Sequence, residues 1–210
     1  MTSAALDRDL VVVDDFYDDP DAMRRLALAA EYVGFPEAQN FAGRESVKSF
    51  YSEAHIQRFS ELVGCPIRVD PAQNVFGKFR VSTAADNART NVHVDDVDWT
   101  AVVYLTPDTD ARGGLGIYAY IPLDLEAMPD SSDLAGYGCK TPADFDAKYV
   151  FPNTHRSECW REIRRVDMKY NRLVLFRGGH RFHGVLELFG ESTTSGRLSQ
   201  NFFFDQADVG

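Results

Sequence analysis

The stretch Trp99-Thr100-Ala101-Val102-Val103-Tyr104-Leu105 decides the fold of this chain of 210 residues. β-Branched and aromatic side chains dominate it, and they favour a buried strand. Similar short apolar segments, separated by turns and polar loops, occur at residues 75–81, 115–121, 171–176 and 197–204. The chain from about residue 66 onward therefore predicts roughly eight short strands.

The N-terminal part of the chain carries helix signals instead. Asp19-Pro20 predicts the start of a first helix, with aspartate as the cap and proline in the first turn. Ser52 predicts the cap of a second helix, and Gly64 predicts its end. Two helices followed by strands predict an α+β fold with a β-sandwich or barrel core. A jelly roll would close such a core by bringing early and late strands together.

Residues 122–165 interrupt the rhythm of the strands. They hold four prolines and the signal for a capped helix at Thr141-Pro142. Long insertions within compact domains are typically lids or binding loops. Residues 35–50 also look irregular. We expect one domain over residues 1–210 with a lid at 122–165, after which strands resume at Val166.

Composition narrows the range of partners and locations. The formal net charge of −10 makes nucleic acid and anionic membranes poor partners. The sequence has no apolar run of about 18 residues, so no membrane span is predicted. Residues 1–9 lack an apolar signal region, and the three scattered cysteines are typical of reduced thiols. These features predict a cytoplasmic protein and leave its oligomeric state open.

A polar pair interrupts the apolar pattern just before the central strand. His93 and Asp95 are two positions apart, so a strand would turn them to the same face. With one later histidine they form two imidazoles and one carboxylate, the ligand set typical of a non-haem Fe(II) oxygenase. His183 and His180 compete for the third place. His183 is favoured because it begins an alternating strand, whereas His180 lies in a glycine-rich turn.

Arg197 stands 14 residues after His183, at the start of the last strand. Ser199 shares its face of that strand. A guanidinium group holds a carboxylate through two parallel hydrogen bonds, and a hydroxyl adds another donor. Taken alone, Arg197 is better explained by a salt bridge at a barrel rim. Together with the histidines it indicates a cosubstrate that carries a carboxylate.

The motifs occur in a fixed order: His93-Val94-Asp95, the apolar strand, Tyr104-Leu105-Thr106-Pro107, Gly113-Gly114, Asn171 to Phe176, His183, and Arg197-Leu198-Ser199. As an ordered set they resemble the Fe(II)/2-oxoglutarate-dependent dioxygenase superfamily. The similarity is to a bacterial group of small, single-domain proteins within the prolyl-hydroxylase-like branch. It covers residues 75–204 and extends to the helical N-terminal opening.

The resemblance implies a double-stranded β-helix, a jelly roll of the cupin-like kind, with the N-terminal helices packed on one sheet. It implies Fe(II) held by His93, Asp95 and His183, with 2-oxoglutarate and O2 as cosubstrates. Arg197 would bind the distal carboxylate of 2-oxoglutarate, assisted by Ser199. No catalytic residue is implied beyond the metal centre.

Four further residues are weaker candidates. Tyr104, on the strand that follows the metal pair, is a candidate for the same cosubstrate carboxylate. Arg80 is a candidate for a substrate carboxylate, and Asp96 or Asp98 for a substrate amine. Each has an ordinary explanation, since Tyr104 also suits a core aromatic and the others suit solvated surface charges.

Asp95 also bears on the type of reaction. Halogenases of this superfamily carry a small residue in place of the carboxylate, so Asp95 favours hydroxylation, or a related desaturation or ring closure. Family analogy alone favours a small-molecule substrate of bacterial specialised metabolism, such as an amino acid, a peptide or a carrier-protein-bound intermediate. Two alternatives stay open: a jelly-roll metal-binding module without turnover, and a cupin-like metalloenzyme that does not use 2-oxoglutarate. In the second, His180 would join His93 and His183 as a ligand.

Overall fold

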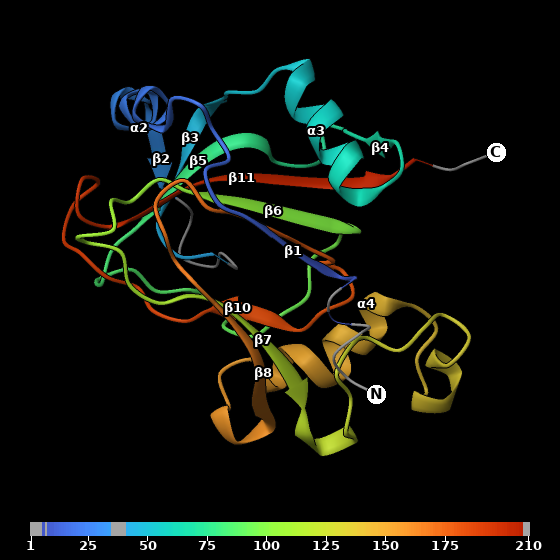
Figure 1. Cartoon of the computed structure of the whole chain (residues 1–210). Coiled ribbons are helices and arrows are strands. Elements are labelled where there is room, and N and C mark those ends of the chain that lie inside the picture. Colours follow the sequence, from blue (N-terminus) through green and yellow to red (C-terminus); the bar gives the residue numbers. More distant parts are fainter. Residues whose placement is uncertain (1–5, 7, 35–40, 208–210) are drawn as a thin grey trace.

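The structure, a computed structural model, describes residue 6 and residues 8–34 and 41–207. Two antiparallel sheets lie one above the other, and helices cover the outer side of the larger one (Figure 1). In spatial order the larger sheet holds β1 (Leu10–Val13), β9 (Leu173–Phe176), β6 (Trp99–Tyr104), β11 (Arg197–Gln206), β5 (Phe76–Ser82), β3 (Arg44–Ser49) and β2 (Tyr32–Gly34), with β4 (Ile67–Arg68) paired to β11. The smaller sheet holds β10 (His183–Val185), β7 (Gly114–Tyr120) and β8 (Trp160–Asp167).

The path of the chain between these sheets is that of a jelly roll. After β5 in the larger sheet, His93 forms an isolated bridge to His183 on the smaller one, and β6 then returns to the larger sheet. β7 and β8 follow in the smaller sheet, β9 in the larger, β10 in the smaller and β11 in the larger. Within the described residues, the strands β5-β11-β6-β9 therefore face a second row, His93-β10-β7-β8. This doubled sheet is the arrangement of a jelly roll, so the predicted α+β, double-stranded β-helix fold is confirmed.

Two helices cover the outer face of the larger sheet, as predicted. α2 (Pro20–Ala29) begins after Asp19, whose carboxylate accepts a hydrogen bond from the Ala22 amide at 2.8 Å. α3 (Glu53–Val63) ends at Gly64, which takes the left-handed conformation at φ 80°. Both helices pack fully buried side chains against the outward-facing residues of the sheet. This packing fixes the larger sheet as a rigid support.

Two predicted boundaries are wrong. Residues 44–49 form β3 rather than an irregular segment, and residues 35–40 lie outside the described part of the chain. β8 begins at Trp160 rather than Val166, so the insertion ends at Cys159. Both strands were hidden because they carry charged side chains on their exposed positions, which dilutes the apolar signal of a strand.

The insertion between β7 and β8 is a series of short turns of helix. These are the 3₁₀ turns Ile121–Leu123, Leu134–Tyr137, Phe151–Asn153 and Ser157–Cys159, the α-helical turn α4 (Pro142–Phe145) and the π-helical turn Asp146–Val150. Their apolar side chains share a core cluster with Val92 and Phe182. Thr154 fastens the insertion to the segment before His93, because its hydroxyl accepts from the Asn91 amide at 2.7 Å and donates to the Val92 carbonyl at 2.7 Å.

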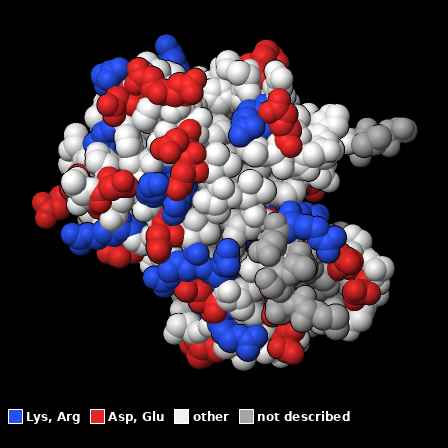
Figure 2. All heavy atoms as spheres, viewed as in Figure 1, with Lys and Arg blue, Asp and Glu red and all other residues white. Residues whose placement is uncertain are grey.

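The surface shown in Figure 2 carries acidic and basic side chains interspersed with one another. Exposed ion pairs occur across distant segments, as between Arg68 and Asp205 at 2.9 Å. Among the described residues, no helix combines the length and the apolar character needed to cross a bilayer.

Candidate metal centre

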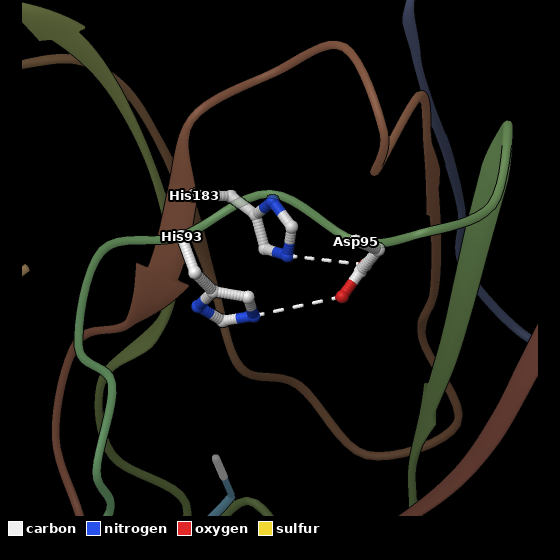
Figure 3. A group of neighbouring side chains, drawn as sticks. All are labelled: His93, Asp95 and His183. Atoms are coloured by element: carbon white, nitrogen blue, oxygen red, sulfur yellow. Dashed lines mark ion pairs between the residues drawn. The ribbon is translucent and has the colours of Figure 1, made fainter. Parts of the chain in front are cut away.

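His93, Asp95 and His183 converge where the segment between β5 and β6 runs beside β10 (Figure 3). Each offers one ligand atom, and these atoms all lie within 4.8 Å of one another. Nε2 of His93 is 3.6 Å from one oxygen of Asp95, and Nε2 of His183 is 3.3 Å from the other. Two ligand atoms held about 2.1 Å from one ion at right angles would be about 3 Å apart. The cluster is therefore close to the spacing that a single ion requires.

Backbone carbonyl groups fix the orientation of both imidazoles. Nδ1 of His93 lies 3.0 Å from the carbonyl oxygen of Asn91, and Nδ1 of His183 lies 2.8 Å from that of Arg181. A carbonyl oxygen only accepts, so each Nδ1 must carry a proton. Nε2 is then the atom of each ring that faces Asp95, and it can bind a metal ion once it has given up its own proton. The two histidines also exchange backbone hydrogen bonds of 2.9 Å in both directions, which places their side chains next to each other.

The carboxylate of Asp95 is held by residues of two other segments. The Thr100 hydroxyl donates to it, and the Asp95 amide donates to the Gly178 carbonyl at 3.0 Å. A Cβ added at Gly178 would lie only 2.5 Å from the Asp95 carboxylate and 2.2 Å from the Thr100 hydroxyl. Gly178 is therefore required by this close approach. Thr100 was not singled out by the sequence, although it shares a strand face with Val102.

Burial and mutual charge determine the ionisation of the cluster. Burial alone would raise the pKa of Asp95, but the charge of His183 and hydrogen bonds from both histidines hold that pKa well below its usual range. Burial lowers the pKa of His93, but a hydrogen bond to Asp95 and the charge of its carboxylate outweigh burial. The pKa of His93 is therefore raised. An ionised carboxylate beside two imidazoles is a ligand set for a divalent first-row metal.

The three side chains form part of the wall of a cavity of about 270 Å³ between the two sheets. Pockets for small molecules begin at about 300 Å³, so this cavity is near the lower end of their size range. One part of the wall is apolar and consists of Val102, Leu115 and Phe176. Another part is polar and comes from β5 and β11: Arg80, Ser82, Arg197 and Asn201.

Arg197 is the clearest unsatisfied group on this wall. It is 7% exposed, and its Nε has no hydrogen-bond partner among the described residues. None of the ion pairs found within the described residues involves it. Its Nη1 donates a long hydrogen bond of 3.4 Å to the Ser199 hydroxyl, and its guanidinium lies 5.4 Å from the ring centre of Tyr104. A buried, unpaired cation is costly, so this arrangement fits a site that receives an anion.

Asn201 lies two positions beyond Ser199 and also faces the cavity. It is 4% exposed, and its side-chain oxygen has no partner among the described residues. Tyr104 is buried beneath Arg197 and is not part of the cavity wall. The inward face of β11 therefore supplies a row of polar groups whose hydrogen-bonding capacity is only partly used.

Of the four remaining candidates, His180, Asp96 and Asp98 do not line the main cavity, whereas Arg80 does. His180 is not in the ligand cluster, and its carbonyl accepts from the Met128 amide at 2.8 Å. Asp98 holds the end of β11, where its carboxylate accepts from the Gln206 amide at 2.9 Å. Asp96 lines a second, smaller cavity together with Asp146. Arg80 lines the main cavity.

Phe41 is a site residue that the sequence did not indicate. Its ring centre lies 5.9 Å from that of His93, and the Arg80 guanidinium lies 4.2 Å from the same ring. It stands just before β3, in a stretch that was expected to be irregular, and a single aromatic residue there gave no signal.

Comparison with known proteins places the chain in one family. Residues 2–204 match the family of unknown function DUF6445. The chain belongs to this family. No curated protein matches its sequence significantly.

Several solved structures are similar to this chain. HygX from Streptomyces hygroscopicus, with nickel and 2-oxoglutarate bound, is 13% identical over 95% of this chain and 84% of that chain, with a TM-score of 0.46. The non-haem α-ketoglutarate-dependent epimerase SnoN from nogalamycin biosynthesis is 15% identical over 97% of this chain and 81% of that chain, with a TM-score of 0.49. A Pseudomonas putida prolyl-4-hydroxylase is 15% identical over 99% of this chain and 100% of that chain, with a TM-score of 0.45. At these identities, the function has to be argued from this chain's own residues.

Proposed function

We propose that this protein is an Fe(II)- and 2-oxoglutarate-dependent oxygenase that hydroxylates a C–H bond of a small molecule, either free or bound to a carrier protein. The observation that carries the proposal is the convergence of two Nε2 atoms and one carboxylate, from His93, His183 and Asp95, on the wall of a cavity. The same cavity holds the guanidinium of Arg197, whose Nε has no hydrogen-bond partner among the described residues. Metal ligands and an anion-binding group thus share one enclosed space.

The donor set supports Fe(II) in particular. Two imidazoles and one carboxylate on one side of an ion leave the remaining coordination positions open, which is the arrangement used by non-haem Fe(II) oxygenases. Structural zinc sites, in contrast, are closed by four protein ligands. The described residues offer no fourth histidine, cysteine or carboxylate to this cluster.

The polar wall supports 2-oxoglutarate as the cosubstrate. This dianion has two carboxylates at the ends of a short chain, so one end can reach the metal while the other pairs with an arginine. Arg197 is buried, has the required charge and forms no ion pair within the described part of the chain, and Ser199 offers a hydroxyl beside it. Tyr104 would support the guanidinium from below rather than bind the cosubstrate directly.

When bound, iron and 2-oxoglutarate supply the oxidation of the substrate with O2. The chain's own residues would hold and orient the metal ligands and shield the site from water. The carbonyls of Asn91 and Arg181 hold the two imidazoles in the ligating tautomer, and Thr100 orients the carboxylate. Val102, Leu115 and Phe176 form the apolar wall, which excludes water from the site.

The positions of the candidate ligands favour this function over the alternatives. An aspartate at position 95 favours hydroxylation, or a related desaturation or ring closure, over halogenation. A centre with three histidines would need His180, which lies outside the cluster. A metal-binding module without turnover would not need, in the same cavity, a buried arginine whose Nε has no partner among the residues that the structure describes.

The insertion at residues 121–159 is proposed as the lid over this site within a single domain. Its helical turns pack against the segment that carries His93. We also propose a cytoplasmic location, which suits the three free cysteines, Cys65, Cys139 and Cys159.

The proposal is tested by binding and turnover. Calorimetry without oxygen should show that the protein binds Fe(II) or Ni(II), and that the metal-loaded protein binds 2-oxoglutarate. With Fe(II) and O2 present, the protein should convert 2-oxoglutarate to succinate and CO2. Asp95→Ala should weaken metal binding by more than about 100-fold, because it removes the one carboxylate that the described residues bring to the cluster, and should abolish succinate release.

Asp110→Ala is the matched control, since Asp110 is an exposed carboxylate in the turn after β6. It should behave like the wild-type protein in both measurements. Normal succinate release by Asp95→Ala would remove Asp95 from the metal centre. Metal binding without any 2-oxoglutarate binding would leave a metal-binding module as the function.

A further inference from the structure

A pocket at the end of the larger sheet, where β11 finishes and β6 begins, shares no residue with the main cavity. Its wall includes three arginines, Arg8, Arg177 and Arg181, but one carboxylate, that of Asp9. The described side chains on this wall therefore carry two more positive than negative charges. We name it the arginine pocket.

Asp9 does not hold the arginines equally. Arg181 donates to Asp9 from Nε at 2.9 Å, its Nη2 lies 2.7 Å from the same carboxylate, and its Nη1 donates to the Glu126 carbonyl at 3.1 Å. Nη1 of Arg177, in contrast, is 3.9 Å from the nearest Asp9 oxygen, which is beyond hydrogen-bond distance. Arg181 is therefore a structural anchor, whereas Asp9 holds the Arg177 guanidinium only loosely.

Two residues of this wall have a buried N–H group without an acceptor among the described residues. These groups are Nε1 of Trp99 and Nε of Arg177, and Trp99 is only 4% exposed. Indole and guanidinium N–H groups can only donate, so an acceptor is what this wall lacks. The other tryptophan, Trp160, has such an acceptor, because its Nε1 donates to the Asn153 carbonyl at 2.8 Å.

The ring of His180, on the same wall, lies in a positive potential. Burial lowers the pKa of His180, and the charges of Arg177 and Arg181 lower it further, whereas Asp9 and Asp130 oppose them with smaller effects. The arginines therefore outweigh the neighbouring carboxylates. An acceptor that enters this pocket is favoured when it is negatively charged.

We propose that the arginine pocket binds a phosphate group, either free or part of a small phosphorylated molecule. Arg177 and Arg8 would pair with its oxygens, and Trp99 would donate its indole N–H. A phosphate dianion matches the excess of two positive charges. Its oxygens point in several directions, as do donors that come from three separate segments of the chain. This inference does not depend on the oxygenase proposal.

The turn that carries Arg177 also supports the candidate metal centre. The carbonyl of Gly178, next in the chain, accepts from the Asp95 amide at 3.0 Å, and the Arg181 carbonyl lies 2.8 Å from Nδ1 of His183. A phosphate bound at Arg177 would therefore hold in place the turn that positions two of the three candidate ligands.

The first test follows the two indole N–H resonances of the full-length, ¹⁵N-labelled protein by NMR. The probes are inorganic phosphate and glycerol phosphate, at constant ionic strength and without added metal, since phosphate also binds metal ions. The Trp99 resonance, identified with Trp99→Phe, should shift until the site is saturated. The Trp160 resonance should not move, because its donor is already paired.

Comparison of the probes identifies the ligand. Saturable binding of either phosphate compound supports the site, and the tighter of the two indicates whether the phosphate is free or part of a larger molecule. Acetate should bind at least about tenfold more weakly, because it has one charge and fewer acceptor oxygens. No saturable shift with either phosphate compound, or equally tight binding of acetate, would overturn the inference.

Two substitutions test the arginines. Arg177→Gln should weaken phosphate binding about tenfold, and its fold is supported because Asp9 keeps Arg181 as its partner at 2.7 Å. Arg8→Gln changes an exposed side chain and should weaken binding in the same direction. Arg161→Gln is the matched control, since Arg161 is exposed on β8 and does not line the pocket. Unchanged affinity in both Arg177→Gln and Arg8→Gln would refute the site.

A last variant separates the arginine pocket from the main cavity. Arg197→Gln should bind phosphate as the wild-type protein does, because Arg197 does not line the arginine pocket. If Arg197→Gln loses phosphate binding while Arg177→Gln keeps it, the anion binds in the main cavity and the inference is wrong. Neither result bears on the oxygenase proposal, which is judged by binding of metal and 2-oxoglutarate.

Discussion

Both faces of β11 bury polar side chains, but the two faces differ in how far those side chains are hydrogen-bonded. On the outer face, Gln200 is fully buried, donates to the carbonyls of Phe50 and Gly77 at 2.5 and 3.1 Å, and accepts from the Tyr17 hydroxyl at 2.6 Å. On the inner face, Arg197 and Asn201 are almost as deeply buried, yet each leaves an atom without a partner among the described residues.

This difference separates support of the fold from function. A buried polar group that is fully hydrogen-bonded stabilises one arrangement of the chain. One that is left unsatisfied lowers stability by about 1–3 kcal/mol, so its presence calls for another explanation, such as a ligand that completes its hydrogen bonds. The outer face of β11 thus supports the helices, whereas on the inner face we infer that the free hydrogen-bonding groups are available to a ligand.

The largest effect is expected from Arg197→Gln. This substitution should raise the dissociation constant for 2-oxoglutarate by about 100-fold, because it removes the charge that pairs with a buried carboxylate. Metal binding should not change. Calorimetry of the metal-loaded protein measures both quantities. An unchanged constant for 2-oxoglutarate would favour a metalloenzyme that does not use this cosubstrate.

Gly178→Ala should weaken binding of Ni(II) by about 10- to 100-fold, because its methyl group would displace the Asp95 carboxylate and the Thr100 hydroxyl that orients it. The unfolding midpoint in urea separates a local from a global effect. Gly136→Ala is the matched control, since an added Cβ there meets nothing within 4 Å among the described residues. Equal metal affinity in both variants would show that the close approach at Gly178 is unimportant.

Gln200→Ala should lower the free energy of unfolding by roughly 1–3 kcal/mol, because it removes three buried hydrogen bonds, from the Tyr17 hydroxyl and to the carbonyls of Phe50 and Gly77. Asn201→Ala, one position further on, should lower it much less, because its side-chain oxygen has no hydrogen-bond partner within the described residues. Urea denaturation of the two variants compares the faces of β11 directly. Equal losses of stability would refute the distinction between them.

The smallest effect concerns pH and the outer face. Burial lowers the pKa of His55 from 6.5, and an interaction with Ser52 only partly opposes this. Below about pH 6.5 the unfolded chain therefore binds more protons at this position than the folded chain, so stability should fall as the pH is lowered through that range. His55→Gln should reduce this pH dependence by less than about 1 kcal/mol, as measured by urea denaturation at several pH values. An identical pH profile in both proteins would exclude a contribution from His55.

Much of the fold could be predicted because local signals agree with it. Asp19, Ser52 and Gly64 mark the helix ends, and the apolar residues 99–104 and 173–176 form two neighbouring strands. β3 and the start of β8 were missed because their alternation is carried by charged residues rather than by a clear apolar face. Such strands are recognised only when their pairing partners are known.

The candidate site could be predicted in part. The spacing of His93 and Asp95 indicated that their side chains point the same way. The alternation of side chains along β11 indicated that Arg197 and Ser199 share a face. The sequence could not reveal Phe41, Thr100 or the role of Gly178, because each acts on the site through a neighbour that is distant in the chain or around a turn.

The sequence by itself determined which residues have the chemistry of the site and which face of its own strand each occupies, because periodicity is a local property of the backbone. Only the tertiary structure decided that His183 rather than His180 completes the cluster, and that Arg197 and Arg80 line the same cavity. These outcomes depend on how distant strands pair and on which of their side chains share the space between the sheets. Contacts across the whole fold set both.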